Sequence, residues 1–200
     1  MMKLRYSVTS PFVRKVVVTA IETGQDQEID RTPTNTADPA SGLSVDNPLN
    51  KVPALLLDDG TRLYDSAVIC EYLDSRKGGR MFPAAGPARW TALRRQALAD
   101  GMMDAALLRR YETQRPENLR SAEWDKKQAL KVSQGLNALE GEASDFGDVS
   151  DIGTLTVAVM LDYLDFRFKS DAWREGCPSL AAWYETFSKR PSLQATRPKD

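Results

Sequence analysis

Hydrophobic and polar residues follow two different periods at the start of the chain. Over residues 3–8 they alternate, and this period of two predicts a strand with one buried face. Over residues 13–21 the apolar side chains recur every three or four positions, which is the stripe of a helix that packs on a sheet. We therefore expect a strand and then a helix that ends near Thr23-Gly24.

The region after this helix is less regular. Residues 26–30 are expected to supply a short second strand. Residues 31–48 show little periodicity and are rich in Thr, Asn, Asp, Ser, Pro and Gly. An irregular segment of this length either borders a binding site or hides a short helix that the pattern misses, and we favour the binding site.

A hairpin and a second helix complete the first half of the chain. The apolar residues 54–57 predict a buried strand, and Asp58-Asp59-Gly60 predicts a tight turn into a return strand over residues 61–64. A helix over residues 67–77 follows, with Ser66 as its expected N-cap. This order of elements predicts a small α/β domain with a mixed sheet.

The second half of the chain predicts helices alone. A long helix opens at Trp90 and is broken by Pro116, and a second helix follows that proline. Residues 155–164 are apolar on nearly all sides, so their helix is expected to be central and buried. Residues 179–187 predict a final amphipathic helix. All four tryptophans lie in this half, as expected of a bundle with its own core.

The composition shifts between these two halves. Residues 78–87 are rich in Gly, Pro and Ala, which indicates a linker. We therefore expect one domain over residues 1–77 and an all-helical domain over residues 88–200.

Charge and composition exclude several classes of function. The net charge of −1 provides no basic field for nucleic acid or anionic lipid, and no apolar stretch is long enough to span a bilayer. We expect a cytoplasmic location, without nucleic-acid or membrane partners. Cys70 and Cys177 are far apart and are interpreted as buried fillers. Because the chain has no histidine, it cannot assemble Ser-His-Asp triads or histidine-ligated metal sites, and we expect no metal.

Ser10 is the first candidate for chemistry. It stands where the first strand gives way to the first helix, so it is the natural N-cap, with Pro11 at the first helical position. This places a hydroxyl beside unpaired backbone N–H groups at the positive end of a helix dipole, and such a site favours an anion. The alternative is that Ser10 caps the helix and does nothing else.

Two later motifs offer binding groups. Pro53 stands at the entrance of a strand and marks an edge; if the Val52–Pro53 bond is cis, the Val52 backbone turns outward and is able to pair with an extended peptide. At Asp65-Ser66 a helix N-terminus offers N–H groups to a carboxylate, while Asp65 offers a partner for an ammonium group. The alternatives are that Pro53 only begins a strand and that Asp65-Ser66 only caps a helix.

The order of these motifs resembles that of a cytosolic glutathione transferase. Ser-Pro-Phe at residues 10–12, Lys-Val-Pro at 51–53 and Asp-Ser at 65–66 precede an all-helical half, and residues 47–53 and 163–167 are similar to those of bacterial members. The likeness covers essentially the whole chain. It implies a thioredoxin-like, glutathione-binding first domain with a mixed four-stranded sheet, a helical-bundle second domain and usually a homodimer.

The resemblance also implies roles for single residues. Ser10 would activate the glutathione thiol, with Thr9 as a weaker candidate. The tripeptide would be held by Lys51 near its glycine end, by the Val52 backbone before cis-Pro53, by Asp65 at its ammonium group and by Ser66 at its γ-glutamyl carboxylate.

Three departures from the family pattern are visible. Members that exchange disulfides through glutathione carry Cys where this chain has Ser10, so that chemistry is disfavoured. Asp65 replaces a more common and longer Glu. The capping pair of the buried helix is Asp151 and Thr154 in place of Ser or Thr followed by Asp, which puts the local stability in question.

The function that the resemblance implies is that of a glutathione S-transferase, an enzyme of detoxification. The thiolate of glutathione would add to a hydrophobic electrophile whose identity the sequence does not give. The alternative is a non-catalytic glutathione-binding or regulatory protein with the same fold.

Overall fold

The computed structural model describes residues 1–199, which form two compact units. The first unit contains Met1–Arg89 and the chain from Pro191 onward; the second contains Trp90–Arg190. The strands are β1 (Met2–Tyr6), β2 (Ile29–Pro33), β3 (Ala54–Leu56) and β4 (Arg62–Leu63). The α-helices are α1 (Pro11–Glu22), α2 (Leu43–Asp46), α3 (Ser66–Ser75), α4 (Gly86–Gln114), α5 (Ala122–Glu142), α6 (Ile152–Arg167), α7 (Trp173–Gly176), α8 (Pro178–Phe187) and α9 (Pro191–Ala195). Single 3₁₀ turns are η1 (Asp26–Glu28), η2 (Pro39–Ser41), η3 (Glu117–Leu119), η4 (Ala143–Asp145) and η5 (Lys169–Asp171).

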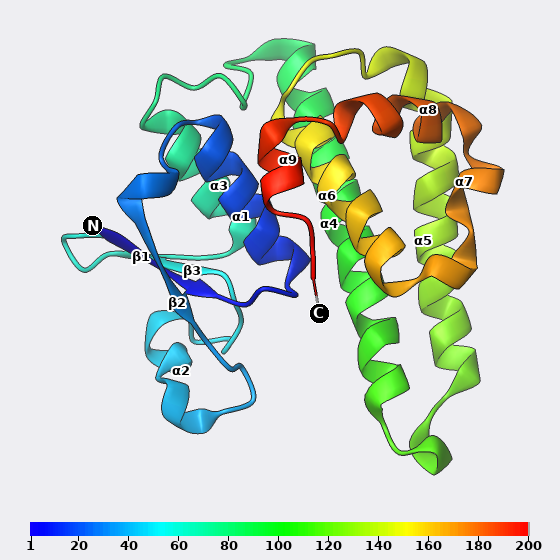
Figure 1. Cartoon of the computed structure of the whole chain (residues 1–200), viewed down its shortest axis with the longest axis horizontal. Helices are drawn as coiled ribbons and strands as arrows, with labels where there is room; N and C mark the ends of the chain where they lie inside the picture. Colours follow the sequence, from blue (N-terminus) through cyan, green and yellow to red (C-terminus); the bar gives the residue numbers. More distant parts are fainter. Residues whose placement is uncertain (200) are drawn as a thin grey trace. The chain divides into compact units, whose positions relative to one another are not determined.

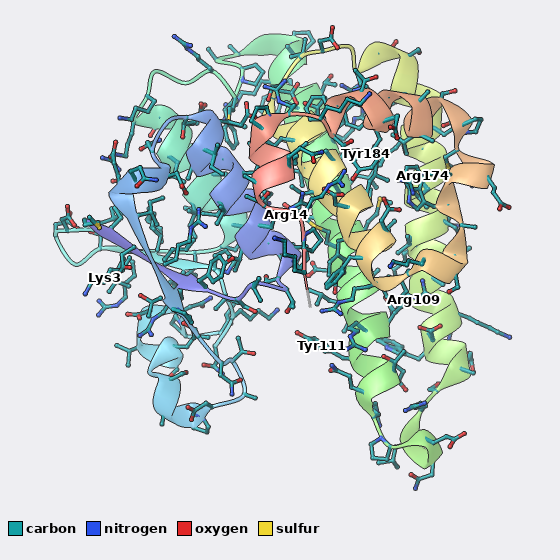
Figure 2. The ribbon with its side chains drawn as sticks, in the orientation of Figure 1. Lys3, Arg14, Arg109, Tyr111, Arg174 and Tyr184 are labelled. Carbon is teal, nitrogen blue, oxygen red and sulfur yellow. The ribbon has the colours of Figure 1, made fainter. Side chains whose placement is uncertain are left out.

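The first unit is built on a mixed four-stranded sheet of order β2-β1-β3-β4. β1 is parallel to β2 and antiparallel to β3, and β3 is antiparallel to β4. Met2 and Leu4 of β1 are buried, whereas Lys3 between them is exposed and is labelled in Figure 2. The alternation at the start of the strand, the hairpin after β3 and the mixed sheet are therefore confirmed. The strand predicted over residues 3–8 ends at Tyr6, however, and Val8 is exposed in the turn that follows.

The second strand lies elsewhere than the sequence predicts. Residues 26–28 form the turn η1, and the strand begins only at Ile29 and continues to Pro33. Its position follows from pairing with β1, where Met2 lies opposite Ile29 and Tyr6 opposite Pro33. β2 is an edge strand, so a proline is tolerated at its end.

Helix α1 is buried more completely than an amphipathic stripe implies. Its apolar face is in the core, but Arg14, Lys15 and Thr19 are buried as well. α1 contacts α3 and α9, and Figure 1 shows α1 and α3 on one face of the sheet with α2 on the other. Contrary to the sequence prediction, the helix over residues 179–187 is not the last one, because Pro191 begins the short helix α9. α9 covers part of α1 in the first unit, although its residues were expected in the helical domain.

The irregular segment after β2 contains the short helix that was the less favoured alternative. It holds η2 and α2, and Asp46 at the end of α2 is buried. The Asp46 carboxylate accepts hydrogen bonds from Arg5 of β1 at 2.7 Å and from Arg62 of β4 at 3.1 Å. The segment is therefore fixed to the sheet by two ion pairs that share the buried Asp46 carboxylate.

The expected linker is held in place by one carboxylate. Asp74 of α3 is 2% exposed and accepts hydrogen bonds from the backbone N–H groups of Arg80, Met81 and Phe82, each at 2.9 Å. The linker is also shorter than predicted, because α4 already begins at Gly86. Pro87 thus lies in the first turn of the helix, where proline is well tolerated, and does not precede it.

The second unit is helical throughout its described residues, apart from its connections, as predicted. α6 is its central helix, and every residue from Ile152 to Leu164 is buried. A Cβ added at Gly153 would lie 2.6 Å from the carbonyl oxygen of Ala92, so this glycine permits the close packing of α6 on α4. The tryptophans contribute unequally: Trp173 is buried, whereas Trp90 and Trp124 are exposed.

Asp151 and Thr154 cap the start of α6 with two reciprocal hydrogen bonds. The Thr154 N–H donates to Asp151 Oδ1 at 2.8 Å, and the Asp151 N–H donates to Thr154 Oγ1 at 3.1 Å. The Thr154 hydroxyl also donates to the carbonyl of Val149 at 2.8 Å. Thr154 thus completes a capping box, although the sequence put the stability of this helix start in question.

Replacing Asp151 by Ala should lower the free energy of unfolding by about 1 kcal/mol, because the Thr154 N–H loses its acceptor at a buried helix start. Urea denaturation followed by circular dichroism measures this change. Asp148→Ala, which removes an exposed carboxylate from the preceding loop, is the matched control and should have little effect. Equal stabilities of the two variants would contradict a stabilising role for this capping box.

Candidate functional site

Two of the sequence motifs meet at the end of β1. The strand ends at Tyr6, and Ser10 follows in the connection to α1. Arg5 lies opposite Ala54 in the antiparallel pair of β1 and β3, so β3 begins where β1 ends. Pro53, the residue before β3, therefore lies at the same end of the sheet as the connection that carries Ser10.

The third motif reaches the same end through β4. Leu55 lies opposite Leu63, the last residue of β4, in the antiparallel hairpin. The chain that leaves β4 toward Asp65 therefore runs beside the start of β3. The sheet brings the connections that carry Ser10, Val52-Pro53 and Asp65-Ser66 to the same end of its strands, as a shared binding site requires.

Ser10 is the N-cap of α1, as predicted. Its φ and ψ are −81° and 120°, and its Oγ accepts a hydrogen bond from the Val13 N–H at 3.3 Å. The Ser10 N–H in turn donates to the Ser7 carbonyl at 3.2 Å. Within residues 1–199, no acceptor is found for the hydrogen of the Ser10 hydroxyl. Because a hydroxyl accepts and donates at once, capping leaves this hydrogen available.

Thr9 precedes this cap and is half-buried. It is not the residue that caps α1, so its hydroxyl lacks the link to the helix N-terminus that Ser10 has. The geometry favours Ser10 over Thr9 as the group that meets an anion.

The Val52–Pro53 peptide bond is cis. Pro53 is buried and Val52 is half-buried just before β3. Among the described residues, no hydrogen bond of the Val52 N–H or carbonyl is found. This backbone is therefore able to pair with an extended peptide, the arrangement on which the sequence interpretation depends.

The loop before Val52 is fixed by an asparagine that the sequence analysis did not single out. The Asn47 side chain donates to the carbonyl of Lys51 at 2.8 Å and accepts from the N–H of Leu49 at 3.0 Å. Asn50 adopts a φ of 52° and donates to the Thr36 carbonyl at 3.0 Å. The Asn-Pro dipeptide at residues 47–48, a turn signal, is the feature that could have revealed this support. Lys51 itself is exposed.

Asp65, and not Ser66, caps α3, so the expected N-cap was wrong by one residue. Asp65 Oδ1 accepts from the Ala67 N–H at 2.9 Å, and Ser66 is the first helical residue. The Tyr64–Asp65 peptide bond is also cis. Asp65 is exposed and Ser66 is 3% exposed. One oxygen of the Asp65 carboxylate serves as the cap, while the other has no partner in the described part of the chain.

The two cysteines lie outside these three motifs in the sequence. Cys70 and Cys177 are both buried, as predicted. Burial, with a smaller contribution from the charge of Glu140, raises the pKa of the Cys177 thiol and keeps it protonated. Within residues 1–199, no group of three or more carboxylate or thiol side chains is placed to hold a metal ion. None of the helices in that range is long and apolar enough to cross a membrane.

Comparison with known proteins extends these observations. Residues 9–76 match the family model of the glutathione S-transferase N-terminal domain. The chain is 35% identical to the uncharacterized GST-like protein YibF of Escherichia coli K12, and the match covers 98% of each chain. A crystal structure of a glutathione transferase family member from Pseudomonas fluorescens Pf-5, with bound glutathione, is 42% identical over all of both chains with a TM-score of 0.95.

A second structure from the same organism contains S-(propanoic acid)-glutathione and is also 42% identical over all of both chains, with a TM-score of 0.91. These likenesses confirm a thioredoxin-like first domain followed by a helical region. The relatives agree with the resemblance that the three ordered motifs indicate, and the chain belongs to the glutathione S-transferase family.

Proposed function

We propose that this protein binds glutathione at this end of the sheet and activates its thiol as a thiolate that attacks an apolar electrophile. The observation that carries the proposal is the Ser10 hydroxyl. It is held at the N-terminus of α1 by the Val13 N–H, and its hydrogen is available to a bound anion.

The peptide part of glutathione finds complementary groups around Ser10. The backbone of Val52 pairs with the cysteinyl residue, and the second oxygen of the Asp65 carboxylate takes the γ-glutamyl ammonium. Ser66, at the start of α3, takes the γ-glutamyl carboxylate, and Lys51 lies near the glycine end. The glutathione and the glutathione conjugate bound in the Pseudomonas structures support glutathione as the ligand.

The interactions are sufficient in magnitude. Lowering the pKa of a thiol from ~8.5 to about 7 requires about 2 kcal/mol. A hydrogen bond from a hydroxyl to an anion contributes roughly 1.5–3 kcal/mol, and the helix dipole adds about 0.3–1 kcal/mol. Ser10 at this helix terminus therefore meets the requirement without a general base.

The reaction then needs few groups from the protein. The thiol proton passes to solvent, and the Ser10 hydroxyl donates to the thiolate that remains. The sulfur electron pair forms the new carbon–sulfur bond while the leaving group departs with the electrons of the broken bond. The protein contributes orientation and a larger fraction of thiolate.

We further propose that the protein acts in the cytoplasm as a homodimer, as members of the family usually do. Size-exclusion chromatography with light scattering measures the assembly state. A molar mass near that of one chain would contradict the dimer.

Replacing Ser10 by Ala should lower kcat/KM for a reactive chloronitrobenzene about 10- to 100-fold, because the hydrogen bond to the thiolate is lost. The pKa of the bound thiol should rise by about 1–2 units, so the rate profile moves to higher pH. Ultraviolet absorbance of the bound thiolate measures this pKa directly.

Two variants control for the structural role of Ser10. Ser10→Thr keeps a hydroxyl that caps and donates, and should retain much of the activity. Thr9→Val removes the neighbouring hydroxyl and should leave the thiol pKa unchanged. A wild-type thiol pKa in Ser10→Ala would rule out the proposed activation.

Replacing Asp65 by Asn should weaken glutathione binding about tenfold or more, because the ammonium group loses its charged partner. Asparagine is an equally good N-cap, so α3 keeps its start and the effect reports the charge. Asp38→Asn is the matched control, since Asp38 caps η2 through the Ala40 N–H in the same way. Calorimetric titration with glutathione measures both, and equal affinities would refute the role of Asp65.

A further inference from the structure

A small cavity in the first unit is lined in part by residues that are hydrogen-bonded to Ser10. Its volume is about 190 Å³, and its lining includes Ser7 and Val13. Both residues are hydrogen-bonded to Ser10: the Ser10 N–H donates to the Ser7 carbonyl at 3.2 Å, and the Val13 N–H donates to Ser10 Oγ at 3.3 Å. Ser10 itself is not part of the described lining, but the two residues bonded to its N–H and its Oγ are.

The cavity lies toward the β2 side of the sheet. Tyr6 of β1 and Arg31 of β2 contribute to its lining. In the sheet order β2-β1-β3-β4, β2 stands on one side of β1 while β3 and β4, which carry the motifs of Val52 and Asp65, stand on the other. The proposed glutathione groups and this cavity thus lie to either side of the connection after β1, which carries Ser10.

The charge of the cavity is one-sided. Its described lining contains four cationic side chains and no acidic one; the cations are Arg14, Arg31, Arg197 and Lys199. Arg31 is ion-paired with Asp26 and lies 5.9 Å from the centroid of the Tyr6 ring. Arg197 and Lys199 are exposed and form no ion pair within residues 1–199. These last two are the cations with charge to offer a ligand.

Arg14 fixes the segment that carries these two cations. It is 6% exposed, and its guanidinium donates to the Leu193 carbonyl at 3.1 Å and to Thr196 Oγ1 at 3.2 Å. Figure 2 shows Arg14 extending from α1 toward the C-terminal segment. Arg197 follows Thr196 directly, so a buried side chain of α1 holds the cationic segment against the cavity.

The remaining lining is apolar. Val8, Val13 and Val17 form this part of the wall, with Ala195 on the C-terminal segment. An apolar wall beside a cationic rim suits a compact molecule with a hydrophobic body and one anionic end. A carboxylate fits best, because a guanidinium is able to bind its two oxygens together.

We propose that the electrophile of this protein carries a carboxylate, which Arg197 and Lys199 bind while its apolar body lies against the valine wall. This inference rests on the proposed function, since it names the substrate class of the same site. Arg14 acts as a positioning residue that holds the segment and does not touch the substrate.

A matched pair of substrates tests the proposal. 4-chloro-3-nitrobenzoate and 4-chloro-3-nitrobenzamide differ in one charge, and in both the thiolate attacks the carbon that bears chlorine. The carbon–sulfur bond forms, the carbon–chlorine bond breaks, and chloride leaves with the electron pair. Each kcat/KM is divided by the uncatalysed rate to remove the difference in intrinsic reactivity.

The wild-type protein should prefer the benzoate, and Arg197→Gln/Lys199→Gln should reduce the ratio of benzoate to benzamide about three- to tenfold, the range expected for two exposed charges. The preference should also fall with added salt. Lys126→Gln/Lys127→Gln on α5 removes the same charge elsewhere and should leave the ratio unchanged. An unchanged ratio in the first double variant would overturn the proposal.

A binding measurement separates this inference from the proposed function. The glutathione conjugates of the two substrates are titrated calorimetrically, with glutathione alone as reference. Tighter binding of the carboxylate conjugate that is lost in Arg197→Gln/Lys199→Gln supports the carboxylate site even where turnover is slow. Binding of both conjugates with one affinity rejects the carboxylate site alone, whereas no binding of glutathione rejects the proposed function and this inference together.

Discussion

The antiparallel placement of β3 between β1 and β4 is the constraint on which the site depends. β3 has three residues and β4 has two, yet their register decides which connections become neighbours. Because β3 runs against both partners, it begins where they end. A parallel β3 would carry Val52 to the far end of the sheet, away from Ser10. The buried Asp46 supports this arrangement, since its carboxylate joins Arg5 of β1 to Arg62 of β4.

The side chains to which we assign chemical roles, Ser10 and Asp65, are also helix caps. Ser10 Oγ accepts the Val13 N–H and still has a hydrogen to donate, and the Asp65 carboxylate caps α3 with one oxygen only. The interpretation of Ser10 and Asp65 as helix caps is therefore correct, and capping still leaves each side chain able to contact a ligand. Capping fixes the position of each group, and a group whose position is already fixed loses little entropy when a ligand binds.

Local signals carried most of the sequence predictions that the structure confirms. The alternation around Leu4, the cap at Ser10 and the apolar run of α6 each depend on residues a few positions apart. The features that the sequence did not reveal depend on distant partners. β2 begins at Ile29 because β1 pairs there, and α2 is a single turn fixed through Asp46 to two strands. The hydrophobic pattern of the sequence cannot reveal the pairing of β2 with β1 or the ion pairs of Asp46, since neither produces a repeat along the chain.

The C-terminal segment illustrates the same limit with a functional consequence. In sequence, Arg197 and Lys199 are two charges in a short polar tail, and the boundary at residue 88 assigned them to the helical domain. In the structure Arg14 binds Leu193 and Thr196, so the tail belongs to the first unit and places its cations beside the turn that holds Ser10. Residues near the C-terminus thus form one wall of the cavity. The hydrogen bond that holds them joins Arg14 to Thr196, which are 182 positions apart in the sequence. If this cavity selects the electrophile as we propose, the selection depends on tertiary contacts of Arg14 on α1, which lie outside the three motifs that indicate the family.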